Sequence, residues 1–89
     1  MPHYVYILQS QVDLSYYKGY SENPTIRLIQ HNNKDSSYTS TKVPWSLVYL
    51  ESCETKTIAL KRERALKKYS TSQIENLIYS GRNIVNEFK

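Results

Sequence analysis

Two tyrosine-rich segments near the start of the chain constrain its fold more than any other feature. His3–Gln9 and Leu14–Tyr20 are rich in aromatic and aliphatic residues, a composition typical of β-strands. The residues between them, Ser10–Asp13, are mostly polar and favour a turn. We therefore predict that the fold begins with a β-hairpin.

The position of the turn determines which tyrosines face each other. A turn centred between Gln11 and Val12 would make Tyr6 and Tyr17 direct cross-strand neighbours, with Cβ atoms roughly 4.5–5.5 Å apart on one face. A slip of one residue would place the two rings on opposite faces, because side chains alternate along a strand. The predicted hairpin therefore pairs Tyr6 with Tyr17.

A helix is predicted over residues 23–32. Its first residues are Asn and Pro, which suit a helix start because Asn caps free amides and Pro needs no N–H partner there. Ile26 and Ile29 lie one turn apart and are expected to form the buried stripe, with Leu28 at its edge.

A different face of this helix carries two polar side chains. Arg27 and His31 are four residues apart, so both can converge on one ligand. The following stretch, Asn33–Val43, is polar and is expected to be a surface loop.

Trp45–Glu51 is predicted to be the third strand. Apolar residues occupy both of its expected faces, with Trp45, Leu47 and Tyr49 on one and Val48 and Leu50 on the other. A strand with two apolar faces is either central in its sheet or flanked by helices.

The next predicted helix is capped by Thr57 and ends near Tyr69. Its expected apolar stripe consists of Ile58, Ala65, Leu66 and Tyr69. Glu63 lies one turn from Ala59 and from Leu66, which places it at the margin of the buried face.

A last helix is predicted from a capping box formed by Ser72 and Glu75. Its inward residues are expected to be Ile74, Leu77 and Ile78, and Gly81 is expected to end it. The whole pattern predicts an α/β fold in the order β-β-α-β-α-α, a three-stranded antiparallel sheet flanked by helices.

Length and cysteine content exclude several classes of protein. The chain has 89 residues, which suit one small domain. Its single cysteine, Cys53, excludes an internal disulfide and a cysteine-rich zinc site. No stretch resembles a secretion signal or approaches the roughly 18 apolar residues of a membrane span, so no membrane association and a cytoplasmic location are expected.

Positive charge is concentrated in one segment. The net charge is +4, and the segment Lys56–Lys68 carries six of the 12 basic residues. This basic segment has two interpretations. It would attract a phosphate backbone through counterion release, or it forms an ordinary solvated helix face. Glu63 is the only carboxylate within Lys61–Lys68, so a hard cation that prefers oxygen ligands would have one clear protein ligand there.

Five positions in order resemble the signature of the GIY-YIG nuclease superfamily. They are the two triplets that contain Tyr6 and Tyr17, followed by Arg27, His31 and Glu63. The resemblance extends from about Tyr4 to Ile78 and is strongest to small stand-alone bacterial members, with the repair nuclease UvrC and phage homing endonucleases more distant. It implies a GIY-YIG domain over residues 1–81 and a short tail over 82–89.

The resemblance also implies a role for each residue. Tyr6 and Tyr17 would position and deprotonate the attacking water, with either one as the base. Arg27 would contact the scissile phosphate, and His31 would donate to a phosphate oxygen or hold a tyrosine hydroxyl. Glu63 would bind Mg²⁺ or Mn²⁺. Contacts to the nucleic-acid backbone are expected from Lys67 and Lys68.

Some residues depart from the family pattern. Tyr4 and Val5 replace the first triplet's Gly and Ile, and Lys18 replaces the second triplet's Ile. Tyr20 stands where UvrC-like relatives carry a lysine. Gly19 is retained, and its lack of a side chain would let a ligand or helix approach the backbone.

The resemblance implies a metal-dependent endonuclease that hydrolyses DNA phosphodiester bonds, with repair or recombination as its setting. The chain has no room for a separate DNA-reading domain, so specificity would come from a protein partner or from nucleic-acid shape, or it would be low. The alternative is a catalytically weak or inactive module that binds nucleic acid or protein. A third alternative is an RNA substrate, because nothing in the motif distinguishes RNA from DNA by its 2′-hydroxyl.

Overall fold

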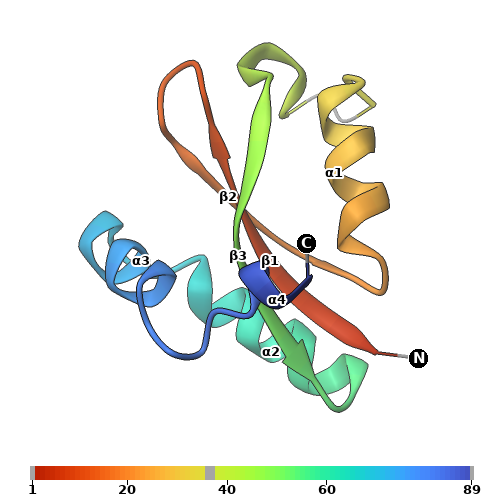
Figure 1. The fold of residues 1–89 in the computed structure, drawn as a ribbon, viewed down its shortest axis with the longest axis vertical. Coiled ribbons are helices and arrows are strands. Elements are labelled where there is room, and N and C mark those ends of the chain that lie inside the picture. Colours follow the sequence, from red (N-terminus) through yellow and green to blue (C-terminus); the bar gives the residue numbers. More distant parts are fainter. Residues whose placement is uncertain (1, 36–37, 89) are drawn as a thin grey trace.

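The computed structural model describes residues 2–35 and 38–88, which form a three-stranded sheet with helices on both faces (Figure 1). In chain order the elements are β1 (His3–Ser10), β2 (Tyr16–Ser21), α1 (Pro24–Asn32), a short 3₁₀ helix η1 (Ser40–Lys42), β3 (Trp45–Cys53), α2 (Lys56–Leu66), α3 (Thr71–Ile78) and α4 (Val85–Phe88). The strand order is β2-β1-β3, and both pairs are antiparallel. The predicted fold class is confirmed, with α4 as an additional helix.

The hairpin of β1 and β2 forms in a register other than the predicted one. Tyr6 pairs with Gly19, and Tyr17 pairs with Leu8. The turn is therefore centred one residue later than predicted, which moves the register by two residues. Because the shift is even, Tyr6 and Tyr17 stay on the same face, as diagonal rather than direct neighbours.

A β-bulge in β3 corrects the predicted alternation of that strand. The register between β1 and β3 shifts between Ile7 and Leu8, so one extra residue is inserted in β3. Trp45 and Leu47 therefore face the same side as Leu50, whereas Tyr49 packs on the opposite side. The strand order also makes β1 the central strand, and β3 lies at an edge with both faces covered.

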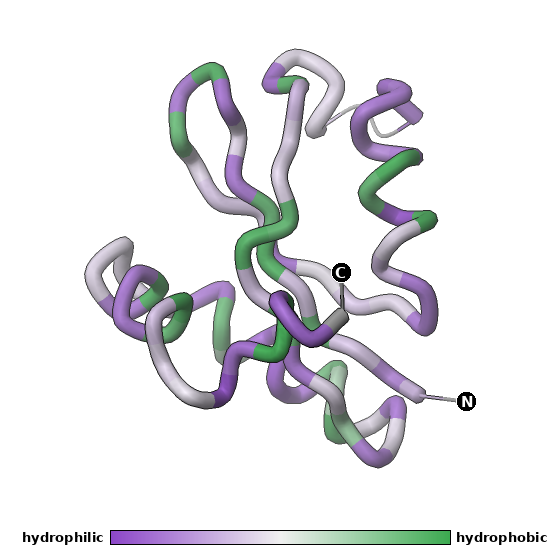
Figure 2. Tube along the Cα trace, viewed as in Figure 1, coloured by the Kyte–Doolittle hydropathy of each residue, from purple (hydrophilic) through white to green (hydrophobic). Residues whose placement is uncertain are grey.

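Two hydrophobic clusters fill the two sides of the sheet. One side packs against α2 and α3 and contains Val5, Ile7, Tyr49, Ala59, Leu66, Ile74 and Leu77. The other side packs against α1 and the C-terminal segment and contains Tyr6, Leu8, Trp45, Leu50 and Val85. Figure 2 shows hydrophobic residues concentrated where the three strands cross. The central strand β1 supplies residues to both clusters and thereby joins the layers.

Helix starts agree with the predictions for α1 and differ for α2 and α3. The side chain of Asn23 caps α1, as predicted. Helix α2 is capped by Thr55 rather than Thr57, and the capping box of α3 uses Ser70 with Gln73 rather than Ser72 with Glu75. Each true cap stands two residues earlier, where the residue has extended backbone angles.

The predicted apolar stripe of α2 is also partly wrong. Leu66 is buried as expected and Tyr69 is partly buried, but Ile58 and Ala65 are exposed. The inward residues of α3 agree with the prediction, since Ile74 and Leu77 are buried and Ile78 packs against them.

The segment after α3 packs along the outer edge of β3. The Asn83 side chain accepts a hydrogen bond from the Leu50 amide at 3.2 Å and donates to the Val48 carbonyl at 2.9 Å. The Ile84 amide then donates to the Leu50 carbonyl at 3.0 Å. Val85 follows and is 6% exposed. Within residues 2–35 and 38–88, no helix has the length and apolar character needed to span a membrane.

Candidate functional site

Tyr6 and Tyr17 bring two phenol rings together on the α1 side of the sheet. Their ring centroids lie 6.4 Å apart, and the ring of His31 lies 4.8 Å from that of Tyr17. Tyr6 is 1% exposed, whereas Tyr17 is partly exposed. The predicted tyrosine pair therefore exists, and its two members differ in their access to solvent.

Gly19 makes room for the Tyr6 side chain. An added Cβ at this position would lie 2.5 Å from both Cζ and the hydroxyl oxygen of Tyr6. The phenol thus crosses directly over the glycine backbone of the neighbouring strand. The expected helix does not fill this space, because the group beside Gly19 is the Tyr6 side chain.

Helix α1 turns its polar residues, rather than its isoleucines, toward the sheet. Ile26 and Ile29 are 50% and 54% exposed, so the predicted buried stripe is wrong. The buried residues of the helix include His31, and the partly buried Leu28 packs against the core. Burial of His31 is possible because both ring nitrogens have hydrogen-bonding partners.

His31 connects the central strand to the loop after α1. Its Nε2 lies 3.2 Å from the Tyr6 hydroxyl, and its Nδ1 lies 2.9 Å from Oγ1 of Thr39. Trp45 Nε1 donates to the Thr39 carbonyl at 3.0 Å, which fixes that loop against β3. Burial, together with the charge of Arg27, lowers the pKa of His31 and favours the neutral ring.

Thr39 was not among the predicted site residues. A threonine within a polar loop carries no signal of its own, and only the folded structure brings it to His31. By occupying Nδ1, Thr39 orients the ring so that Nε2 faces Tyr6.

Arg27 lies one turn before His31 and acts on the same phenol. Its guanidinium donates to Gln30 Oε1 at 2.7 Å. Burial raises the pKa of Tyr6, and the hydrogen bond and charge of Arg27 offset part of that increase. The protein's own residues therefore favour the neutral phenol over the phenolate.

Glu63 reaches the same neighbourhood from α2. Its negative charge is one of the effects that raise the pKa of Tyr6. The carboxylate is 18% exposed and lies 3.8 Å from Lys67 Nζ, an i,i+4 ion pair. The described residues contain no group of three or more His, Cys, Asp or Glu that could hold a metal ion.

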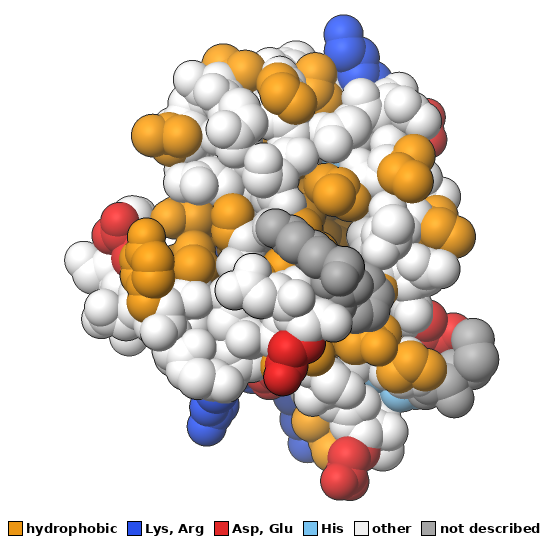
Figure 3. Space-filling view, viewed as in Figure 1, with side chains coloured by type: hydrophobic (Ala, Val, Ile, Leu, Met, Phe, Trp, Pro, Cys, Tyr) orange, Lys and Arg blue, Asp and Glu red, His pale blue; other side chains and the backbone are white. Residues whose placement is uncertain are grey.

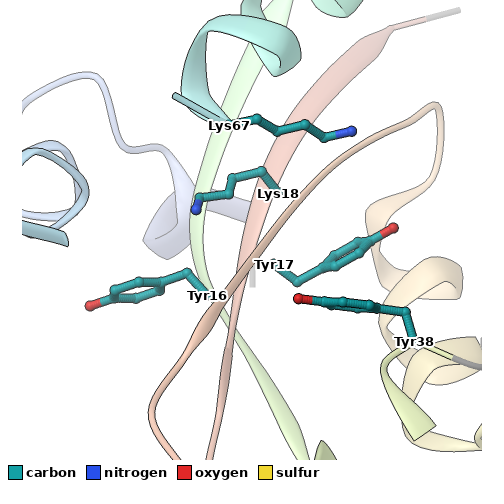
Figure 4. Close-up of a pocket in the computed structure, with 5 residues that line it drawn as sticks. All are labelled: Tyr16, Tyr17, Lys18, Tyr38 and Lys67. Carbon is teal, nitrogen blue, oxygen red and sulfur yellow. The ribbon is translucent and has the colours of Figure 1, made fainter. Parts of the chain in front are cut away.

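A pocket of about 250 Å³ opens beside Tyr17, and we call it the edge pocket (Figure 4). Its lining residues are Tyr16, Tyr17, Lys18, Tyr38 and Lys67. In Figure 4 the rings of Tyr17 and Tyr38 lie side by side, and the Lys18 and Lys67 side chains lie together across the strand from them. Lys68 is exposed and does not line this pocket. Lys18 and Tyr38 were not predicted as site residues.

Charge is unevenly distributed over the surface. On the face shown in Figure 3, the Lys and Arg side chains that are visible lie near the edges. The basic segment of α2 contributes Lys67 to the edge pocket. The positive charges nearest to the candidate site come from Arg27 of α1 and, at the edge pocket, from Lys18 of β2 and from Lys67 at the C-terminal cap of α2.

The fold and this site define a class of small α/β domains in which a sheet carries two tyrosines beside a helical arginine and histidine. Comparison with known proteins identifies the family. The sequence profile described as the GIY-YIG catalytic domain matches residues 2–83. The chain belongs to this nuclease family.

The proteins that resemble this chain are small, and the match covers most of their length. A UPF0213 protein from Staphylococcus epidermidis is 42% identical over 80 residues, covering 89% of this chain and 96% of that protein. One from Haloquadratum walsbyi is 35% identical over 83 residues, with 92% of each chain covered.

A solved structure also resembles the chain. The solution NMR structure of a UPF0213 protein from Bacillus halodurans has a TM-score of 0.59 and 32% identity, covering 92% of this chain and 87% of the other. The names of these relatives specify no activity or substrate.

Proposed function

We propose that the protein is a divalent-metal-dependent endonuclease that hydrolyses DNA phosphodiester bonds. One observation carries the proposal: side chains from two helices act on one phenol of the sheet, since Arg27 of α1 and Glu63 of α2 both influence the pKa of Tyr6 in β1. Phosphodiester hydrolysis needs an activated water, neutralisation of charge on the phosphate and help for the leaving oxygen. Tyr6, Arg27 and a cation on Glu63 would meet these needs in turn.

Glu63 suits Mg²⁺ or Mn²⁺ by its donor chemistry. A hard cation prefers oxygen ligands, and Mg²⁺ keeps several waters and uses phosphate oxygens of the substrate, so one carboxylate is sufficient. The bound cation would supply Lewis acidity to the phosphate and stabilise the leaving oxygen. Lys67 competes for the same carboxylate, so metal binding would free this lysine for a phosphate.

Tyr6 is the better candidate for the base, because its proton has an acceptor. Its hydroxyl lies 3.2 Å from His31 Nε2. A stable phenolate would be costly, since burial raises the pKa of Tyr6. Transfer of the water proton to Tyr6, together with transfer of the Tyr6 proton to Nε2, avoids that phenolate and leaves an imidazolium on His31. Tyr17, which is partly exposed, would position the water.

Glu63→Gln tests the proposal, with Glu54→Gln on an exposed residue as the matched control. Cleavage of single-stranded, duplex and branched DNA would be measured with Mg²⁺ and with Mn²⁺, and folding would be followed by urea denaturation. We expect Glu63→Gln to remove cleavage while the fold persists. Cleavage above a tenth of the wild-type rate at saturating Mg²⁺ would exclude Glu63 as the metal ligand.

A second candidate is a nucleic-acid-binding module without catalysis. The Glu63–Lys67 ion pair favours it, because the same contact is expected from a glutamate with a purely structural role. In that case the wild type would bind nucleic acid and cleave none of the three DNA structures with either metal.

A further inference from the structure

The edge pocket lies on the free side of β2. Three of its lining residues, Tyr16, Tyr17 and Lys18, are consecutive in this strand. Successive side chains of a strand point to opposite faces, so consecutive residues can line one pocket only along a free edge. The strand order β2-β1-β3 leaves β2 with such an edge. The pocket therefore extends from the Tyr17 side of the sheet around to the Lys67 side.

Aromatic rings form one wall of the pocket. The ring centroids of Tyr17 and Tyr38 lie 5.9 Å apart. Tyr38 is 63% exposed and belongs to the loop after α1, so much of its ring is open to solvent. Exposed tyrosines are well suited to stacking on a planar partner, because the ring provides contact area at little conformational cost.

Two lysine side chains, Lys18 and Lys67, line the part of the pocket across from these rings. Lys67 is paired with Glu63. Among the described residues, no ion pair joins Lys18 to a carboxylate, although Lys18 is half-buried and this burial lowers its pKa. A partly desolvated cation without an anionic partner favours a negatively charged ligand.

We propose that the edge pocket receives one unpaired nucleobase of the substrate, stacked on Tyr38 and Tyr17, while Lys18 and Lys67 hold the adjoining phosphate. This inference rests on the proposed function and narrows its substrate to nucleic acid that has an unpaired nucleotide beside the scissile bond. A paired base cannot enter, because its faces are covered by neighbouring base pairs. The volume of about 250 Å³ is below the range of about 300–1,000 Å³ for drug-sized ligands and suits one base.

The test is a binding experiment on the full-length protein. Fluorescence anisotropy with Ca²⁺ in place of Mg²⁺ would give the affinity for a labelled oligonucleotide, single-stranded or in duplex. A series of single strands would carry one abasic nucleotide at successive positions. The variants are Tyr38→Ala and Tyr38→Phe, with Tyr79→Ala as the control, since Tyr79 is 89% exposed and lies outside the pocket.

We expect Tyr38→Ala to weaken single-strand binding by about 5- to 150-fold, the range for loss of one base–aromatic stack. Tyr38→Phe, Tyr79→Ala and duplex binding should change little. At one position the abasic substitution should weaken wild-type binding and have no further effect on Tyr38→Ala, because ring and base would be parts of one contact. Competition by dTMP or inorganic phosphate should be weak, since neither supplies a strand.

Several results would overturn the base pocket. They are equal losses of single-strand and duplex binding in Tyr38→Ala, additive effects of ring and base removal at every position, full competition by inorganic phosphate alone, and no binding of single strands. The proposed hydrolysis is tested separately. Single-strand binding with the expected pattern but without any cleavage would support the base pocket and exclude the nuclease activity.

Discussion

Gly19→Ala gives the sharpest test of how the site is built, because it adds one methyl group against the proposed base. The new Cβ would lie 2.5 Å from Tyr6 Cζ and from its hydroxyl oxygen, whereas ordinary contacts begin at 3.4 Å, so the ring must move by about 0.9 Å. Tyr6 is 1% exposed and has little room to move. We expect the phenol to leave His31 Nε2, which lies 3.2 Å away.

The expected magnitudes follow from this displacement. Overpacking in a core costs about 1–3 kcal/mol, and the loss of glycine flexibility in the unfolded chain offsets about 0.4–1 kcal/mol. The free energy of unfolding should therefore decrease by about 1–2 kcal/mol. A catalytic group displaced by about 1 Å can cost about 10²-fold in rate, so cleavage should decrease by a similar factor.

Urea denaturation and cleavage assays would measure the two effects. Gly81→Ala is the matched control, since a Cβ at Gly81 would meet nothing within 4 Å. In a Tyr6→Leu background, Gly19→Ala should cost much less stability because the clashing atoms are gone. If Gly19→Ala proved as stable and active as Gly81→Ala, Gly19 would not be the residue that holds Tyr6 in place.

Three further predictions concern charge. Arg27→Ala should lower turnover by about 10²-fold or more and affect DNA affinity measured in Ca²⁺ far less, because the guanidinium would act on charge that develops in the transition state; matched losses would favour the binding module. Lys67→Ala combined with Lys68→Ala should lower the salt slope of DNA binding by about 2, whereas an unchanged slope would place the nucleic acid elsewhere. Because burial lowers the pKa of His31, the unfolded state binds its proton more readily, and the free energy of unfolding should decrease as pH drops below about 6.5. Urea denaturation at pH 7.5 and 5.5 should show a smaller decrease for His31→Gln, and an equal decrease would contradict this assignment.

Local chemistry allowed the strands and the start of α1 to be predicted from the sequence, whereas the candidate site was predicted from the resemblance to a nuclease signature. Asn followed by Pro at residues 23 and 24 suits a helix start, and Asn23 caps α1 in the structure. The triplets that contain Tyr6 and Tyr17 are strand-like whatever surrounds them. Their resemblance to a nuclease signature agrees with the family match over residues 2–83.

Properties that depend on tertiary packing could not be predicted in this way. The hairpin register depends on where the turn closes, and one residue there moves the pairing by two. Helix α1 was assigned its buried face from apolar content, but hydrogen bonds to both nitrogens of His31 allow a polar face to be buried while Ile29 stays exposed. The bulge in β3 reverses the alternation of inward and outward side chains after Leu47, and no residue type in the strand predicts a bulge there.

The C-terminal segment has a consequence for association between copies of the chain. An edge strand usually presents unpaired amides and carbonyls to which another strand can add. On β3 the outward amide and carbonyl of Leu50 are already bonded to Asn83 and Ile84, and the Val48 carbonyl is bonded to Asn83. An incoming strand would have to displace these bonds together with the buried Val85. The middle of this edge is thus protected from aggregation by strand addition, which leaves the opposite edge, on β2, as the one available to a partner.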